Sequence, residues 1–179
     1  TINTVGPSIM KYGTEVMKKE ILPKILKGEI FFSIGYSEPG AGTDLANLST
    51  RAVRDGDEFV INGQKIFTSL IDHADYVWLA CRTNPDAGKH AGISIVLVPT
   101  TSEGFSWTPI HTMGGASTST TYYQDVRVPA ANVVGEIDKG WEVIVNQLNY
   151  ERVSLAAPGT LERPYIETVR WAQETKLAD

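Results

Sequence analysis

The feature that most constrains the fold is a long central segment, from Ile30 to about Gly135, in which short β-rich runs alternate with turn residues. This texture is typical of an antiparallel sandwich or barrel. Eight runs are predicted as strands: Phe31 to Ser37, Ser49 to Arg54, Glu58 to Asn62, Gln64 to Ser69, Tyr76 to Thr83, Gly92 to Val98, Phe105 to Ile110 and Thr120 to Val126. Between the second and third, Asp55-Gly56 predicts a hairpin with a type I′ turn, because Asp-Gly tolerates positive φ.

Helical patterns flank this segment on both sides. The stretch from Thr1 to Glu29 predicts two short helices joined at Tyr12-Gly13, with Thr14 as the N-cap of the second and an end at Lys27-Gly28. The second helix has an apolar stripe of Ile21, Leu22, Ile25 and Leu26, and Pro23 weakens it. A later helix is expected from Asp138 to about Ala157, with a kink or break at Pro158-Gly159 and Pro164. The predicted fold class is therefore α+β.

Composition and charge exclude several functional classes. A formal net charge of -5 argues against nucleic acid or an anionic membrane as the main partner. The longest apolar stretches, such as Ile93 to Pro99, are far shorter than the ~20 residues of a membrane span. The single cysteine, Cys81, lies in an apolar run and predicts a packed thiol in a reducing compartment. No metal site is expected, because the three histidines lie far apart: His73, His90 and His111.

The loop Glu38-Pro-Gly-Ala-Gly-Thr-Asp44 follows a predicted strand and carries two glycines beside a hydroxyl. Such a loop can bring backbone N–H groups close to a phosphate or a flavin. It lacks the G-x-G-x-x-G spacing and the Gly-Lys-Ser/Thr ending of the common nucleotide-binding loops. Judged alone, it is equally well explained as a tight turn that leaves a strand.

On the later helix, positions 144, 148, 151 and 155 share one face, and three of them are apolar: Ile144, Leu148 and Leu155. The fourth is Glu151. A carboxylate on an apolar stripe is costly to bury without a partner. It either pairs with a cation such as Arg152 or Lys65, reaches water, or has a chemical role.

Four groups of residues, in order along the chain, resemble the middle portion of the acyl-CoA dehydrogenase family. They are Tyr12-Gly13 with Leu22-Pro23 and Gly28-Glu29; Ser37 to Asp44; Asn62 to Lys65 with Phe67 to Ser69; and Asp125 to Pro129 with Asn132 and Gly135. The resemblance runs nearly end to end. It implies FAD as the cofactor.

The resemblance also assigns roles to individual residues. Tyr36 and Ser37 would contact the flavin ring, and Gly42 and Thr43 the flavin, with Thr43 at its pyrophosphate and at the acyl-CoA. The ring's face and N5 side would meet a run of three residues: Phe67, Thr68 and Ser69.

The segment Leu148-Asn-Tyr-Glu-Arg152 resembles the isovaleryl and long-chain members, which carry their catalytic glutamate on this helix. That resemblance makes Glu151 the base that removes the α-proton of an acyl-CoA thioester, while the β-hydrogen leaves as hydride to flavin N5. Asn149 and Arg152, three residues apart on one face, would contact the substrate, Arg152 at its CoA portion. Electrons would then pass to an electron-transfer flavoprotein.

By the same resemblance, residues 1–29 are the end of an N-terminal helical domain, 30–136 the β-rich flavin- and acyl-CoA-binding domain, and 137–179 the start of a C-terminal helical domain. The chain begins and ends in helical pattern, so we expect further sequence on both sides and little activity from this chain alone. A homo- or heterotetramer is expected, in the bacterial cytoplasm or, for a eukaryote, the mitochondrial matrix.

Three alternatives stay open. The enzyme could be an acyl-CoA oxidase or a flavin monooxygenase relative that passes electrons to oxygen. The chain could instead belong to a subunit or fragment whose role is assembly. Within the dehydrogenases, it could be the base-bearing subunit of an actinobacterial heterotetramer that acts on steroid side chains.

Overall fold

The computed structural model describes residues 1–115, 117–155 and 159–175, without the side chains of residues 154 and 155. Two short helices open the chain, α1 (Val5–Tyr12) and α2 (Glu15–Lys27). Thr14 caps α2 as predicted, because its Oγ1 accepts a hydrogen bond from the Met17 N–H at 3.2 Å. Gly28 ends the helix in the left-handed conformation, also as predicted. Pro23 lies inside α2. The predicted apolar stripe is wrong at Leu26, which is 76% exposed.

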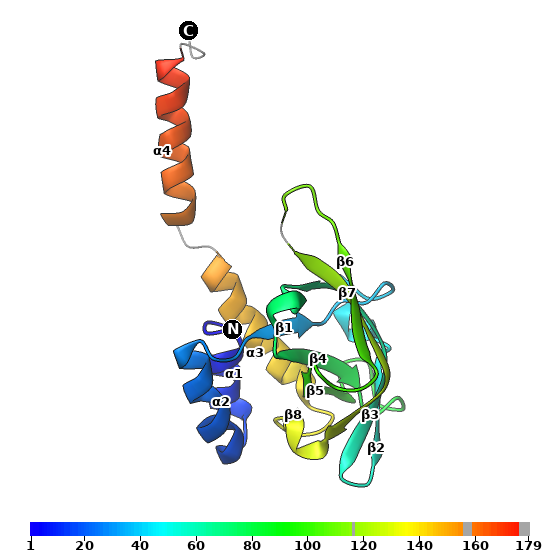
Figure 1. The fold of residues 1–179 in the computed structure, drawn as a ribbon. Coiled ribbons are helices and arrows are strands. Elements are labelled where there is room, and N and C mark those ends of the chain that lie inside the picture. Colours follow the sequence, from blue (N-terminus) through cyan, green and yellow to red (C-terminus); the bar gives the residue numbers. More distant parts are fainter. Residues whose placement is uncertain (116, 156–158, 176–179) are drawn as a thin grey trace.

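All of the predicted strands are found, and they join one sheet (Figure 1). Two predicted runs merge into the long β3, and the two-residue β8 was not predicted. The strands are β1 (Phe32–Gly35), β2 (Arg51–Asp55), β3 (Glu58–Ser69), β4 (Tyr76–Arg82), β5 (Ile93–Pro99), β6 (Phe105–Ile110), β7 (Thr118–Pro129) and β8 (Val133–Val134). Three short 3-10 helices, Leu45–Asn47, Ile71–His73 and Ala130–Asn132, lie between them.

The sheet corrects the sequence analysis in two respects. Its order is β6-β7-β3-β2-β4-β5-β8, with β1 beside β4, and no pairing joins β6 to β8, so it is not closed into a barrel. It is also mixed rather than antiparallel, because β1 runs parallel to β4, and β2 meets β4 in one parallel pair. A parallel pair needs a long crossover connection, and here the whole β2–β3 hairpin lies between β1 and β4.

The hairpin between β2 and β3 is present, with Asp55 opposite Glu58. Of the two loop residues, Gly56 has a φ of 63°, whereas Asp57 does not have positive φ. A type I′ turn requires positive φ at both positions, and positive φ at the first alone fits type II′. The type I′ prediction is therefore wrong, because the glycine occupies the first loop position.

The central strands β4 and β5 are buried on both faces. On one face Trp78 and Ala80 pack with buried residues of α1, α2 and the later helix. On the other, Val77, Leu79 and Cys81 pack with side chains of β2, β3 and β7, so the curved sheet encloses a second core. Cys81 is a free, fully buried thiol, which confirms the packing prediction, and burial raises its pKa to about 12.

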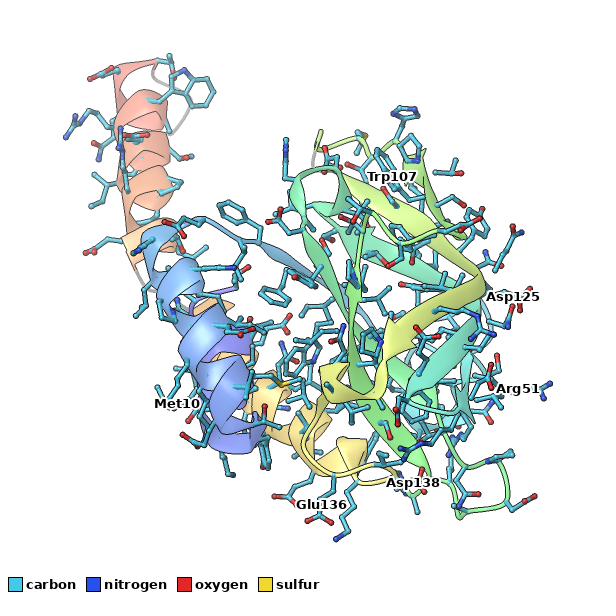
Figure 2. All side chains as sticks on the ribbon, turned by 60° about the horizontal axis from the view of Figure 1, so that its bottom comes forward. Met10, Arg51, Trp107, Asp125, Glu136 and Asp138 are labelled. Atoms are coloured by element: carbon cyan, nitrogen blue, oxygen red, sulfur yellow. The ribbon has the colours of Figure 1, made fainter. Side chains whose placement is uncertain are left out.

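The chain ends in two helices, α3 (Gly140–Leu155) and α4 (Gly159–Glu174). Helix α3 packs against α1 and β5, whereas α4 extends away from the rest of the chain (Figure 1), and none of its described residues is buried. Pro164 lies within α4 and does not end it; Pro158 lies outside the described residues. Figure 2 shows Met10 on the side of the helices away from the sheet, and Arg51 and Asp125 on the outer surface of the sheet.

Candidate functional site

A groove of about 550 Å³ lies where β1, the end of β3 and α3 meet. Five of the residues predicted for the site line it together: Tyr36, Ser37, Phe67, Ser69 and Glu151. They come from positions more than a hundred residues apart in the chain, so their meeting is a property of the fold. The groove combines hydroxyl groups, an aromatic ring and a carboxylate. This is a donor set suited to a heterocycle bound next to a proton acceptor.

The end of β3 is irregular at the residues that face the groove. The pairing of β3 with β7 shifts between Lys65 and Thr68, and within this bulge Phe67 has a φ of 60°. Leu70, just beyond, has a φ of 59°; the two side chains are 62% and 59% exposed. A left-handed backbone costs a bulky residue about 1–3 kcal/mol, and such strain clusters at binding sites. The bulge therefore presents an aromatic ring to the groove at an energetic cost.

A buried ion pair holds the Gly-rich loop to β3. Lys65 Nζ lies 2.8 Å from Glu38 Oε1 and also donates to the Tyr36 carbonyl at 3.0 Å. Glu38 accepts further hydrogen bonds from Ser49 and from the Thr50 N–H. Burial alone would raise the pKa of Glu38, but the Lys65 ammonium and the Thr50 hydrogen bonds lower it to about 2. Lys65 is thus the partner of Glu38 and not, as sequence analysis allowed, of Glu151.

Tyr36 lines the groove, but most of its side chain is buried in the core. It is 7% exposed, and its hydroxyl accepts a hydrogen bond from the Trp78 indole N–H at 2.9 Å. Burial raises the pKa of Tyr36, so the phenol is neutral. Ser37 is half-buried, and its carbonyl accepts from the Ile66 N–H at 2.8 Å, which ties the start of the loop to β3. Ser69 is exposed to the groove, and its carbonyl accepts from Ser33.

Three other predicted cofactor residues do not line the groove. Thr68 is fully buried, with its hydroxyl 3.4 Å from that of Thr121, because the β3 alternation turns it to the opposite face of the sheet. Gly42 and Thr43 are exposed in the loop beyond the tight Glu38–Ala41 turn. A Cβ added at Gly42 would meet nothing within 4 Å, so open space lies over that backbone, where another molecule can approach it.

Helix α3 places Glu151 because its start is fixed against β5. A Cβ on Gly140 would lie 2.7 Å from Ser94 Cα, so only glycine allows this approach. The Ser94 hydroxyl accepts from the Asp138 N–H at 2.8 Å. Along the predicted face, Ile144 is fully buried and Leu148 half-buried. The side chain of Leu155 lies outside the described residues.

Glu151 itself is half-buried, and its Oε2 accepts a hydrogen bond from Gln147 Nε2 at 3.0 Å. Sequence analysis missed Gln147, although its spacing of four residues on the helix could have signalled the contact. Asn149 and Arg152, predicted to contact substrate, are exposed on α3 and do not line the groove.

Within the ranges that the structure describes, no three His, Cys, Asp or Glu side chains gather as metal ligands would. No helix in the same ranges is long and apolar enough to cross a membrane.

Comparisons with known proteins give the groove its context. The pattern of the family described as "Acyl-CoA dehydrogenase, middle domain" matches residues 33–126. The acyl-CoA dehydrogenase FadE26 of Mycobacterium tuberculosis is 63% identical over 181 residues, which cover 99% of this chain and 45% of that relative. This chain therefore spans less than half the length of that relative.

Two solved structures have the same fold. The Tcur3481-Tcur3483 steroid ACAD superposes with a TM-score of 0.95 at 61% identity, covering 99% of this chain and 47% of that one. In the ChsE4-ChsE5 complex from Mycobacterium tuberculosis, the TM-score is 0.80 at 67% identity, covering 84% of this chain and 39% of that one. With the middle-domain pattern spanning more than half of its residues, this chain belongs to the acyl-CoA dehydrogenase family.

Proposed function

We propose that this chain supplies the flavin-contacting and base-bearing part of an FAD-dependent acyl-CoA dehydrogenase. One observation carries the proposal: Glu151 from α3 lines the same groove as Ser37, Phe67 and Ser69 from the β-rich segment. A carboxylate next to an aromatic ring and hydroxyl groups is what proton abstraction beside a bound heterocycle requires. Membership of the family supports the same reading.

The residues of the groove fit the ring system of FAD. In the proposal, Phe67 packs on the ring from its strained position, and the Ser37 and Ser69 hydroxyls bind its polar edge. Gly42 and Thr43 bind the phosphates farther along the loop, over open backbone. Thr68 is fully buried and Tyr36 nearly so, and both contribute by holding this wall in place. When bound, FAD would accept the hydride that leaves the substrate.

Glu151 takes the proton in this scheme. Its carboxylate accepts the α-hydrogen of the thioester as a proton, and the electrons of that C–H bond become the new double bond as the β-hydrogen departs with its own pair. Asn149 and Arg152, exposed on the same helix, contact the substrate outside the groove, Arg152 at its CoA portion.

The names of two similar structures support a proposal for the substrate class and the assembly. Both structures carry paired names. The Tcur3481-Tcur3483 structure is called a steroid ACAD, and the ChsE4-ChsE5 structure is called a complex. We propose a CoA thioester of a steroid side chain as substrate, a heteromeric assembly, and an electron-transfer flavoprotein as acceptor. FadE26 comes from a bacterium, so the mitochondrial alternative is not borne out and a bacterial cytoplasm is proposed. The three-part division at residues 29 and 136 is proposed with it.

The test is an anaerobic titration of the complete natural polypeptide, loaded with FAD, with a steroid side-chain acyl-CoA. Loss of flavin absorbance and formation of one enoyl-CoA per flavin would support dehydrogenation. Air is then admitted to the reduced enzyme. Rapid peroxide formation would overturn the dehydrogenase assignment in favour of an oxidase.

A further inference from the structure

Gln147 is a buried amide for which packing alone gives no explanation. Its side chain is fully buried on α3, in a helix turn whose other buried side chains, Val143 and Ile144, are apolar. Its Nε2 donates to Glu151 Oε2 at 3.0 Å. Its Oε1 is buried and has no hydrogen-bond partner among the described residues.

Such an arrangement is costly. An unsatisfied buried carbonyl destabilises the folded state, and a methionine or leucine would fill the same space without that cost. The hydrogen bond of Gln147 that the structure gives runs to the Glu151 carboxylate, and not to the backbone of α3 or β5. The amide therefore does not fasten the helix to the sheet. Its contact is with the side chain that lines the groove.

We propose that Gln147 is the positioning residue for Glu151; this inference rests on the proposed function. Its N–H holds the carboxylate toward the groove in one rotamer, so that the base is already oriented toward the substrate α-carbon when the substrate binds. Its free Oε1 can serve as the hydrogen-bond acceptor when Glu151 is protonated. Once Glu151 has taken the proton, the carboxylic acid is a donor, and a turn of the amide presents Oε1 as its acceptor. One side chain thus satisfies both protonation states.

The test compares Gln147→Met with Asn146→Leu in the FAD-loaded natural polypeptide. Asn146 is an amide on the same helix whose Nδ2 is also buried without a partner among the described residues, but it bonds to Lys11 instead of Glu151. The measurement is the anaerobic rate of flavin reduction by saturating acyl-CoA, across pH.

For Gln147→Met we expect the limiting rate to fall about 10- to 100-fold, the size of effect that a misplaced catalytic group produces, with little change in half-saturation. The acid limb of the pH profile should move to higher pH, because the ionised carboxylate has lost a donor. Other titratable groups near Glu151 are the Tyr36 phenol and the adjacent Arg152, both unchanged in these variants. Asn146→Leu should keep the wild-type profile.

A wild-type rate and profile in Gln147→Met would overturn the inference, and so would a rate lowered equally at every pH. Gln147→Asn withdraws the amide by one methylene and should behave as Gln147→Met does, which keeps the test open if methionine prevents folding. Glu151→Gln distinguishes failure of the positioning role of Gln147 from failure of the proposed catalytic role of Glu151. If it stops flavin reduction while Gln147→Met does not slow it, only the positioning role fails; if it reduces flavin normally, the proposed base fails.

Discussion

Lys65→Met should destabilise the protein far more than the loss of a surface ion pair, because it leaves the buried Glu38 carboxylate without its cationic partner. Lys65 is fully buried and the side chain of Glu38 is 6% exposed. Breaking a buried pair by removing one partner costs about 3–5 kcal/mol. Glu38 would keep its hydrogen bonds from Ser49 and Thr50, so we expect a value near the lower end, about 3 kcal/mol. For an unfolding unit of about 150–250 residues that corresponds to a fall in Tm of about 6–12 °C.

The assay is urea unfolding of the apoprotein, with FAD affinity measured in parallel. The Lys65 ammonium also binds the Tyr36 carbonyl, so its loss should loosen the loop and weaken FAD binding. The matched control is Arg127→Met, which removes the exposed ion pairs with Asp55 and Glu58 and should change stability little. Replacing both buried partners, as in Glu38→Leu with Lys65→Met, should cost less than Lys65→Met alone, since no charge is left buried. If Lys65→Met is no more destabilising than Arg127→Met, the reasoning is refuted.

Three further outcomes are expected. The folded pKa of Glu38, about 2, lies below the ordinary 4.5, so its contribution to stability is complete above about pH 4.5 and is lost as pH falls toward 2. In Glu38→Gln, the free energy of unfolding should therefore depend less on pH in this range than in the wild type, as measured by unfolding at a series of acid pH values. Phe67→Gly should relieve the positive φ and stabilise the apoprotein by up to about 1 kcal/mol while raising the Kd for FAD, a trade-off visible by pairing urea unfolding with flavin titration. Cys81, fully buried and with its pKa raised to about 12, should react with a thiol reagent only after unfolding; modification of the native protein at the rate of an exposed thiol would contradict its packing.

Features with local causes could be predicted from the sequence. The Thr14 cap and the Gly28 end of α2 each depend on a few neighbouring residues, and most strands followed from β-rich runs between turns. The parallel pairing of β1 with β4 could not be predicted, because it depends on which distant strands meet. That the sheet stays open, with no pairing between β6 and β8, also depends on which distant strands meet.

The candidate site divides in the same way. Glu151 stood out because a charge interrupts an apolar helix face, and the Gly-rich loop because of its turn residues. The strain at Phe67 arises from a bulge between β3 and β7, and the pairing of Lys65 with Glu38 from the same nonlocal register, so neither had a sequence signal. Gln147 had the right helical spacing to meet Glu151, yet a lone amide carries no mark of its role.

The central claim is that Glu151 is the base of an acyl-CoA dehydrogenase, and Glu151→Gln tests it most directly. The measurement is the anaerobic rate of flavin reduction by acyl-CoA in the FAD-loaded natural polypeptide. Glu142→Gln serves as control, since that carboxylate is exposed on the same helix and bonds to Tyr12. The account predicts that Glu151→Gln binds FAD normally and reduces it at least about 100-fold more slowly, as loss of a general base requires, while Glu142→Gln keeps the wild-type rate. Flavin reduction by Glu151→Gln at the wild-type rate would contradict it and assign the proton to another residue.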